Sequence, residues 1–396
     1  MAIDLHRHTL TWNEGADHYT TQWMTERLVS PPKQVLLADD TVTADMAYRD
    51  IMQGAVLLYR GDFQNAKQLM SALARRVDKR KGSKKAKPEV TPAHAFHLHR
   101  QSQAQRARVL NSILVPLNAD FSVPLRRAPD VHEALQAAWG TLQWQGLACI
   151  SLRELLGLIG AFEWRKKGVE IAALGAAPNN RVFPFYGVYS PVRGEYLDLL
   201  AKADVKPFVR PDALAFDIGT GTAVIAALLA RRGVPRILAT ELDTRALECA
   251  AFNVQQLGVQ QQVSVVQADL FPPGQADLLV CNPPWLPAKP VAAIERAIYD
   301  DNSAMLKGYL NGVKTHLKPG GRAWLLMSDL AEHLGLRKPG ELQQWIAQAD
   351  LRVVHVSHTR PVHSKSLDPS DPLHQARKQE VTSLYVLEPV SEPEAL

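Results

Sequence analysis

The sequence has few of the features that mark secreted, membrane-spanning or disulfide-stabilised proteins. Its 396 residues include only three cysteines, Cys149, Cys249 and Cys281, and no C-x-x-C pair. An odd number of scattered cysteines argues against a disulfide framework or a zinc knuckle and is typical of a reducing cytoplasm. No apolar run approaches the roughly 20 residues that a membrane-spanning helix needs, and the N-terminal stretch lacks the apolar core of a secretory signal. We therefore expect a cytoplasmic protein without a membrane segment.

The sequence also lacks a clear metal-ligand cluster. His94, His97 and His99 lie close together, but no cysteine or carboxylate nearby completes a plausible metal shell. On a helix, His94 and His97 would share a face that His99 does not. We expect these histidines to be polar surface residues and predict no metal site.

Positive charge is concentrated in the first half of the chain. Residues 1–180 contain 23 basic and 17 acidic residues, whereas the remainder has a net charge of −1. The basic segment 75–87 alone has eight basic residues and one acid. Such a run is either a solvated loop or an electrostatic contact for RNA phosphates. Because no aromatic residue interrupts it, it could supply affinity but little base recognition.

The chain is long enough for two domains. Residues 1–30 show no clear period and are expected to be a loosely packed arm, and a β-α-β-α pattern follows from residue 34 to residue 76. The stretch 175–180 is the expected boundary because it combines glycine, proline and asparagine. We predict an accessory or substrate-recognition domain over residues 1–180, either mixed α/β or largely helical, and a second domain over residues 181–396.

The second half alternates between strand-like and helix-like stretches. From residue 214 these are 214–217, 222–232, 236–240, 244–257, 262–267 and 277–281, then 304–316, 322–328, 341–349, 351–357 and 381–387. Alternation of this kind predicts an α/β fold with a doubly wound, largely parallel sheet.

The stretch 276–285, a strand that ends at two prolines, is the most informative about function. Residues 276–281 read as a strand buried on both faces, and Pro283 and Pro284 cannot continue it because proline donates no hydrogen bond to a sheet. Asn282 therefore lies at a carboxyl edge, where open α/β sheets bind ligands.

The Asn282 side-chain oxygen and the Pro283 carbonyl could each accept one hydrogen from an amide or exocyclic NH2 group. This would aim the nitrogen lone pair at an electrophile, while Trp285 offers a flat stacking face. The stretch predicts methyl transfer to a planar nitrogen. The alternative is a proline turn with Trp285 as core filler.

A ligand-binding loop is predicted where a strand passes through Gly219 and Gly221 into a helix. Val224 stands where a dinucleotide fingerprint would have its third glycine, and a ligand without a pyrophosphate does not require that glycine. Asp217 can orient the loop amides or meet a cationic ligand. Glu241 and Asp269 end the next two strands, where they suit ribose hydroxyls and an adenine amine. Together these residues predict a cradle for an adenosine.

With these motifs, residues 183–390 resemble the class I S-adenosylmethionine-dependent methyltransferases. Residues 282–285 are similar to the (N/D)-P-P-(Y/F/W) motif of enzymes that methylate amino or amide nitrogens. Residues 269–271 and 277–282 are similar to release-factor glutamine methyltransferases and to small-domain rRNA guanine methyltransferases. The chain departs from these in having Trp285 where Tyr or Phe is commoner, and residues 190–195 match the R-P-E-T-E run only loosely.

The resemblance implies a seven-stranded sheet and S-adenosyl-L-methionine as the cofactor. It implies these cofactor contacts: Asp217, Gly219, Thr220, Gly221, Glu241, Asp269 and Asn282. It implies a catalytic substrate clamp of Asn282, Pro283, Pro284 and Trp285.

We therefore predict an N-methyltransferase that acts on an amino or amide nitrogen of a macromolecule. The basic first half favours RNA, through an exocyclic base amine, and the resemblance favours the alternative, protein glutamine methylation of the release-factor type. The partner is accordingly RNA or a translation-associated protein. A nicotinamide dehydrogenase would lack the clamp, and an aminopropyltransferase would have an acid at position 282. A non-catalytic S-adenosylmethionine-binding module would be expected to lose the glycine pair or the clamp. The sequence leaves the oligomeric state open.

The connection 358–378 is a further candidate for substrate contact. It is long for a loop inside a compact domain, and such loops are often functional. It carries Arg360, Lys365, Arg377 and Lys378. This connection is either a wall of the acceptor groove that contacts the anionic backbone of a substrate, or a solvated hairpin tip with ordinary surface charge.

Overall fold

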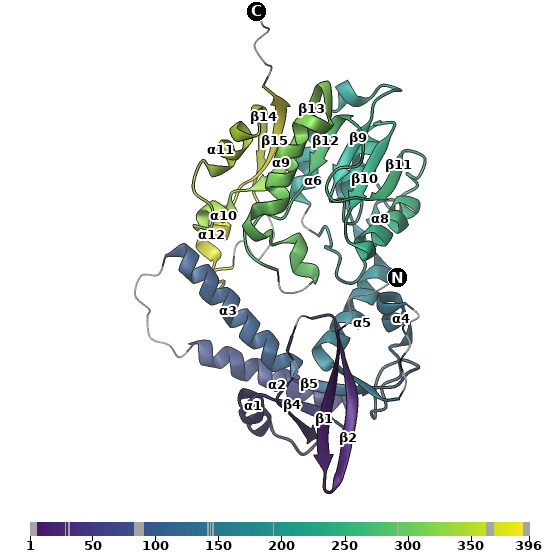
Figure 1. Cartoon of the computed structure of the whole chain (residues 1–396), viewed down its shortest axis with the longest axis vertical. Coiled ribbons are helices and arrows are strands. Elements are labelled where there is room, and N and C mark those ends of the chain that lie inside the picture. The colour runs from purple at the N-terminus through teal and green to yellow at the C-terminus, as the bar shows by residue number, and fades with distance from the viewer. Residues whose placement is uncertain are drawn as a thin grey trace, which may run out of the picture. The chain divides into compact units, whose positions relative to one another are not determined.

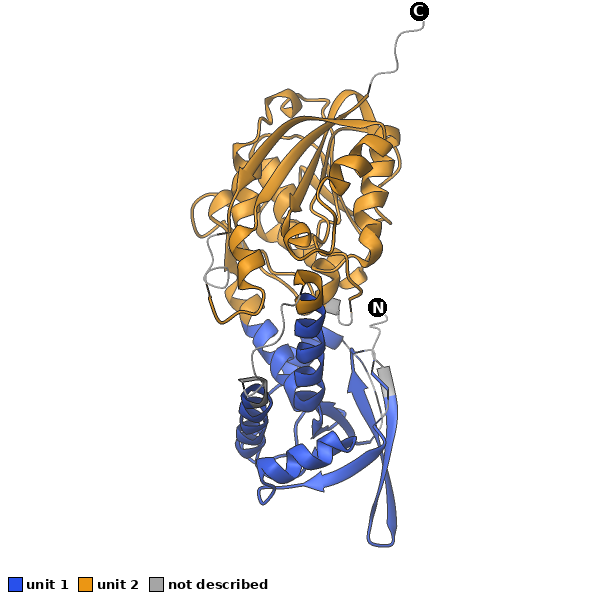
Figure 2. Ribbon diagram, turned by 90° about the vertical axis from the view of Figure 1, so that its left-hand side faces the viewer, with its two compact units in different colours: residues 1–90, 96–163 blue, residues 91–95, 164–396 orange. Residues whose placement is uncertain are grey.

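A computed structural model describes residues 6–27, 29–30, 32–82, 91–140, 142, 144, 146–192, 194–290, 293–361 and 368–390. Its contacts divide the chain into two compact units (Figure 2). Unit 1 comprises the described residues of 1–90 and 96–163, and unit 2 those of 91–95 and 164–396. None of the helices that the structure describes is long and apolar enough to cross a membrane.

Unit 1 is built on a six-stranded sheet with the strand order β1-β2-β6-β5-β4-β3. Its strands are β1 (His6–Glu14), β2 (Asp17–Thr25), β3 (Gln34–Ala38), β4 (Ala55–Tyr59), β5 (Ile113–Leu117) and β6 (Ala148–Ser151). The helices of this half of the chain are α1 (Ala44–Met52), α2 (Phe63–Gly82), α3 (Pro92–Asn111), α4 (His132–Trp139) and α5 (Leu152–Lys167). Of the two architectures expected for the accessory region, the structure has the mixed α/β one.

The first two strands correct one sequence expectation. A loosely packed arm over residues 1–30 is wrong for β1 and β2, which form an antiparallel hairpin. A two-residue turn joins them, and Gly15 adopts a positive φ of 63° there. Leu10, Trp12 and Trp23 are buried, while the residues between them are mostly exposed. The buried apolar positions are few and are separated by polar residues such as Thr9, Thr11 and Asn13, which weakens the periodic signal in the sequence.

Unit 2 contains the predicted alternation of strands and helices. Its strands are β7 (Val169–Glu170), β8 (Arg181–Val182), β9 (Ala215–Ile218), β10 (Ile237–Glu241), β11 (Val263–Gln267), β12 (Ala276–Cys281), β13 (Leu317–Ser328), β14 (Leu351–Thr359) and β15 (Thr382–Pro389). Its α-helices are α6 (Glu195–Lys202), α7 (Val224–Arg231), α8 (Thr244–Gln256), α9 (Ala304–His316), α10 (Leu330–His333), α11 (Glu341–Gln348) and α12 (His374–Gln379). Short 3-10 helices are η1 (Ala172–Leu174), η2 (Lys206–Phe208), η3 (Ala293–Ala297) and η4 (Asp301–Ser303).

The main sheet of unit 2 has seven strands in the order β11-β10-β9-β12-β13-β15-β14 (Figure 1). Strand β15 is antiparallel to both of its neighbours, and the other pairings are parallel. The chain winds outward from β9 to β11 and then returns to β12 on the other side of β9. This confirms the expected doubly wound seven-stranded sheet and places its topological switch point between β9 and β12.

Helices cover both faces of this sheet (Figure 1). On one face, Val280 and Trp324 pack with α6, α7 and α8 residues such as Leu228. On the other, Leu279 packs with α9 and α11 residues such as Tyr309. Because consecutive strand residues point to opposite faces, the apolar run of β12 supplies both cores, which is why it reads as continuously hydrophobic.

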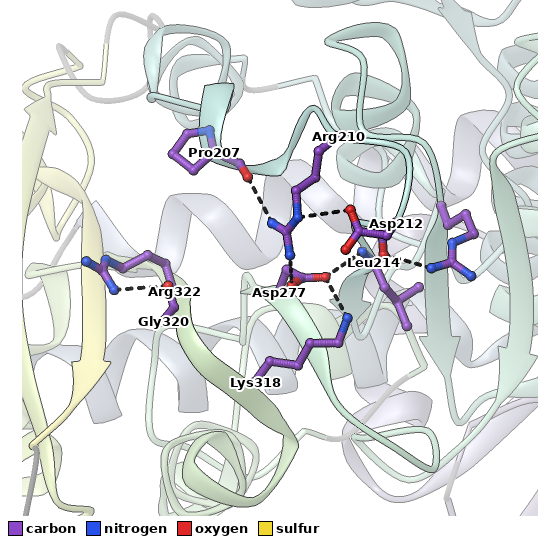
Figure 3. Close-up of polar contacts among 9 residues, drawn as sticks. Pro207, Arg210, Asp212, Leu214, Asp277, Lys318, Gly320 and Arg322 are labelled. Atoms are coloured by element: carbon purple, nitrogen blue, oxygen red, sulfur yellow. Dashed lines mark hydrogen bonds and ion pairs between the residues drawn. The ribbon is translucent and has the colours of Figure 1, made fainter.

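The amino end of β12 is fixed by a buried carboxylate (Figure 3). Asp277 accepts hydrogen bonds from Lys318 Nζ at 2.9 Å, the Leu214 backbone N–H at 2.8 Å and the Arg210 guanidinium. Burial acts to raise the pKa of Asp277, but these hydrogen bonds outweigh it and hold the pKa below its usual range. The network ties β9, β12 and β13 together at the sheet edge opposite the carboxyl ends of these strands.

Candidate active site

The carboxyl edge at the switch point brings the glycine loop and the proline motif together. Ile218 of β9 is in register with Cys281 of β12 and with Thr240 of β10. The residues that follow directly on these three are Gly219, Asn282 and Glu241. Neighbouring strands in a sheet are about 5 Å apart, so these residues leave the sheet side by side.

The loop after β9 turns tightly into α7. Gly219 and Gly221 have positive φ angles of 69° and 56°, which glycine adopts without a steric penalty. Thr220, which lies between them, is buried, and its backbone N–H donates to the Thr240 carbonyl at 2.9 Å. The loop is therefore fastened to the neighbouring strand.

Asp217 holds this loop from inside. Its Oδ2 accepts hydrogen bonds from Thr220 Oγ1 at 2.6 Å and from the Ala226 backbone N–H at 3.0 Å. Only 1% of the residue is exposed. Burial raises the pKa of Asp217 to about 6, although both hydrogen bonds oppose the shift and the charge of Glu241 adds to it. These contacts are to a loop hydroxyl and to a backbone amide of α7, so Asp217 ties the glycine loop to the start of that helix.

Glu241 is positioned by three backbone groups. Its Oε2 accepts from the Gly221 N–H at 3.0 Å, and its Oε1 accepts from the Leu242 N–H at 2.9 Å and the Asp243 N–H at 3.3 Å. Burial raises the pKa of Glu241, and the three hydrogen bonds counteract it. The half-buried carboxylate is thus fixed beside the glycine loop.

Asp269 is exposed beyond the end of β11, two residues after the last strand residue. The Ala268 N–H donates to the Glu241 backbone carbonyl at 3.2 Å. The residue before Asp269 is therefore hydrogen-bonded to the backbone of the neighbouring strand end. Leu242, which the sequence reasoning missed, is 60% exposed directly after Glu241. The sequence signal for Leu242 is an apolar residue that directly follows an acid at the end of a strand.

A second missed feature lies at the start of α9. The terminal methyl group of Met305 lies so close to Gly219 that a Cβ atom at position 219 would clash with it. Asp300 fixes this turn, because its carboxylate accepts from the Met305 N–H at 3.0 Å and the Leu306 N–H at 3.1 Å. Asn302 and Ser303 both have positive φ angles. No sequence pattern of the stretch pointed to this approach, which depends on the return of α9 across the sheet.

The predicted clamp is ordered by its own side chains. Trp285 Nε1 donates to Asn282 Oδ1 at 3.0 Å, and Pro283 is buried between them. The Trp285 carbonyl accepts from Arg337 Nη2 at 3.4 Å. Cys281 is fully buried in the core on the α9 side of the sheet. Trp285 packs against the core on the α9 side of the sheet, and its indole N–H contacts the residue expected to bind the acceptor.

The remaining predicted elements lie partly outside the described residues. Of the basic segment 75–87, residues 83–87 lie outside the described residues, and so does Lys365 of the connection 358–378. That connection contains α12, and Arg377 within it pairs with Asp371 at 3.0 Å. Strand β14 ends at the carboxyl edge, because it is antiparallel to β15 and thus parallel to β13. Among the described residues, no group of three or more His, Cys, Asp or Glu side chains is arranged to hold a metal ion.

Known proteins share this part of the chain. Residues 197–338 match the family model described as methyltransferase small domain. A release factor glutamine methyltransferase of Cereibacter sphaeroides is 35% identical over 34% of this chain and 51% of its own length. A ribosomal protein L11 methyltransferase of Pelotomaculum thermopropionicum is 40% identical over 20% of this chain and 26% of its own. A ribosomal protein uL3 glutamine methyltransferase of Neisseria gonorrhoeae is 30% identical over 26% of this chain and 37% of its own.

The chain thus spans about half, or less, of the length of these curated relatives. The matched segment contains the glycine loop, the three acids and the clamp, which are the residues on which the sequence resemblance rests. The comparisons therefore confirm the resemblance to methyltransferases over residues 197–338.

Proposed function

We propose that the chain is an S-adenosylmethionine-dependent N-methyltransferase that modifies an amino or amide nitrogen of a macromolecule. The observation that carries this proposal is the adjacency of Gly219 and Asn282, which leave neighbouring parallel strands from paired residues at the switch point. A cofactor on the glycine loop and a nitrogen at the clamp would be neighbours, as direct displacement requires.

The residues of the carboxyl edge fit S-adenosylmethionine. Glu241, fixed by backbone amides, can accept hydrogen bonds from both hydroxyls of a ribose, and the exposed Asp269 can accept from an adenine amine. Leu242, with 60% of its surface exposed, offers an apolar face to a purine ring. Gly219 and Gly221 let the ligand approach the backbone, and the carboxylates of Asp217 and Glu241 complement a cationic ligand.

S-adenosylmethionine supplies an electrophilic methyl group when bound. The chain's own residues act on the acceptor: Asn282 Oδ1 and the Pro283 carbonyl accept its two hydrogens and orient its lone pair. Positive charge grows on the nitrogen during transfer, so neutral oxygen acceptors stabilise the transition state without a strong base. The proton can then leave to water. The ring of Trp285 supplies a stacking face for the acceptor.

Two acceptor classes are supported by different observations. The net charge of +6 over residues 1–180 favours RNA, with an exocyclic base amine as the acceptor. Two of the relatives are named as glutamine methyltransferases, one acting on a release factor and one on ribosomal protein uL3. These names favour a protein glutamine as the acceptor. Both acceptors present a planar NH2 group, so the same clamp serves either one.

A reducing cytoplasmic location agrees with the state of the thiols. Cys149, Cys249 and Cys281 are all free and buried. Burial raises the pKa of the Cys249 thiol to about 12, which keeps it protonated and unreactive at neutral pH.

Methyl transfer into a cell extract tests the proposal. The full chain is incubated with extract and S-adenosylmethionine labelled on its methyl group, and the product is then digested with nuclease or with protease. We expect incorporation that Asn282→Ala abolishes. Label released by nuclease identifies RNA as the acceptor, and label released by protease identifies a protein. Absence of incorporation together with absence of S-adenosylmethionine binding by calorimetry would refute the function.

A further inference from the structure

The clamp contains a side-chain hydrogen bond that the expected stacking role of Trp285 does not explain. Trp285 Nε1 donates to Asn282 Oδ1 at 3.0 Å, and both residues are half-buried. The two residues between them are prolines, whose rings fix φ near −65°. With φ fixed at both intervening residues, the backbone between positions 282 and 285 has little freedom, which favours a persistent contact between the two side chains.

The bond determines which end of the Asn282 amide serves the acceptor. The oxygen and nitrogen ends of an asparagine amide have nearly the same shape, and its terminal torsion is broad and roughly two-fold. A reversed amide would present hydrogens to the acceptor NH2 group in place of a lone pair. An indole N–H can bond only to the oxygen end. A carbonyl oxygen has two lone pairs, so one remains for the acceptor.

Trp285 is itself anchored on both sides. Its carbonyl accepts from Arg337 Nη2 at 3.4 Å, and Arg337 is only 4% exposed, with its guanidinium over the Trp345 ring. The next residue, Leu286, donates its N–H to the Ile298 carbonyl at 3.3 Å and forms a bridge to Tyr299. The indole therefore acts from a fixed backbone and can hold a neighbouring side chain in place.

We propose that Trp285 is a positioning residue whose indole N–H locks the Asn282 amide with its oxygen toward the acceptor nitrogen. This inference rests on the proposed methyl transfer and deepens it. It assigns a chemical role to the tryptophan that stands where tyrosine or phenylalanine is commoner. Phenylalanine carries no hydrogen-bond donor, and tyrosine carries its O–H at a different position on the ring, so neither reproduces the indole N–H.

The kinetic test compares Trp285→Phe with the wild-type full chain. Phenylalanine keeps a stacking face and removes the N–H, so an orienting role lowers kcat and a stacking role raises KM. We expect kcat for methyl transfer to fall about tenfold, which corresponds to about 1.4 kcal/mol, the net value of one hydrogen bond. The acceptor KM should change by less than about twofold, and S-adenosylmethionine affinity should be unchanged. Trp164→Phe is the matched control, because Trp164 is 55% exposed and lies far along the chain from the clamp.

A spectroscopic measurement makes the inference independent of turnover. The Trp285 indole N–H signal, assigned in the 15N-labelled full chain by its loss in Trp285→Phe, should be protected from solvent exchange. Asn282→Ala should remove that protection, whereas Trp164→Phe should leave it intact. Unchanged kcat in Trp285→Phe, or an indole N–H that exchanges equally fast with and without Asn282, would overturn the inference. Failure of the wild type to transfer methyl while the indole remains protected would refute the proposed function and leave the hydrogen bond established.

Discussion

The buried carboxylate of Asp217 makes a prediction that can be worked from the structure. The side chain is 1% exposed, and its pKa is raised from 3.8 to about 6. A difference of this size corresponds to about 3 kcal/mol by which ionisation destabilises the folded state. Since the folded pKa lies above the unfolded one, the stability associated with Asp217 is fully present below about pH 4 and is lost as the pH rises through 6.

Asp217→Asn removes this ionisation and keeps the shape of the neutral acid. The amide oxygen can take the position of Oδ2 and accept from Thr220 and Ala226 as the carboxylate does. We expect the stability of the variant relative to wild type to increase between pH 4 and pH 7, by at most about 3 kcal/mol. Because other titrating groups are shared by both proteins, they largely cancel in the difference.

Hydrogen–deuterium exchange of the peptide covering 215–231 in the full chain measures this difference where it arises. The rates are corrected for the intrinsic pH dependence of exchange. Asp198→Asn, which alters an exposed residue of α6, is the matched control and should show no such trend. A difference between Asp217→Asn and wild type that stays constant from pH 4 to pH 7 would refute the reasoning. A cationic cofactor should favour the ionised carboxylate, so S-adenosylmethionine affinity of the wild type should rise over the same range.

Three further predictions concern the two edges of the unit 2 sheet and the 358–378 connection. Glu241→Ala should weaken S-adenosylmethionine binding about ten- to a hundredfold, from the loss of roughly 1.5–3 kcal/mol of charge-assisted hydrogen bonding; calorimetry measures this, and unchanged affinity would contradict the cofactor assignment. Asp277→Asn should lower the free energy of unfolding by about 1–3 kcal/mol at neutral pH; because the pKa of Asp277 is lowered, this cost should shrink as the pH falls below about 4, and urea titration at both pH values checks it. The third prediction concerns the four basic residues of the 358–378 connection, Arg360, Lys365, Arg377 and Lys378. Their replacement by glutamine should raise the acceptor KM and flatten its salt dependence without changing cofactor affinity. An unaltered salt dependence would exclude contact between these residues and an anionic substrate.

The sequence was sufficient for the fold of unit 2 because the signals involved are local. A strand buried on both faces, such as β12, must be continuously apolar, and a proline pair must end it. Acids that follow consecutive parallel strands must meet at one edge, which brings Glu241 beside the glycine loop. Periodicity and turn chemistry therefore predicted the doubly wound sheet and the meeting of the glycine loop, Glu241 and Asn282 at its carboxyl edge.

Local patterns were insufficient where the sequence signal was weak or the contact depended on distant residues. The β1–β2 hairpin was missed because polar residues fill its exposed face. The approach of Met305 to Gly219 depends on how α9 returns across the sheet, and the anchoring of Trp285 depends on Arg337, which is 52 residues away along the chain.

The sequence by itself determined the alternation of strands and helices in unit 2, the residue types at its carboxyl edge and the methyltransferase resemblance. Tertiary structure decided how those residues are used. It directed Asp217 into the loop, fixed Glu241 with three backbone amides and joined Trp285 to Asn282. The physical reason is that periodicity records only which face of an element is buried. Hydrogen-bond partners depend on side-chain direction and on strand register, and those are set when the whole sheet packs.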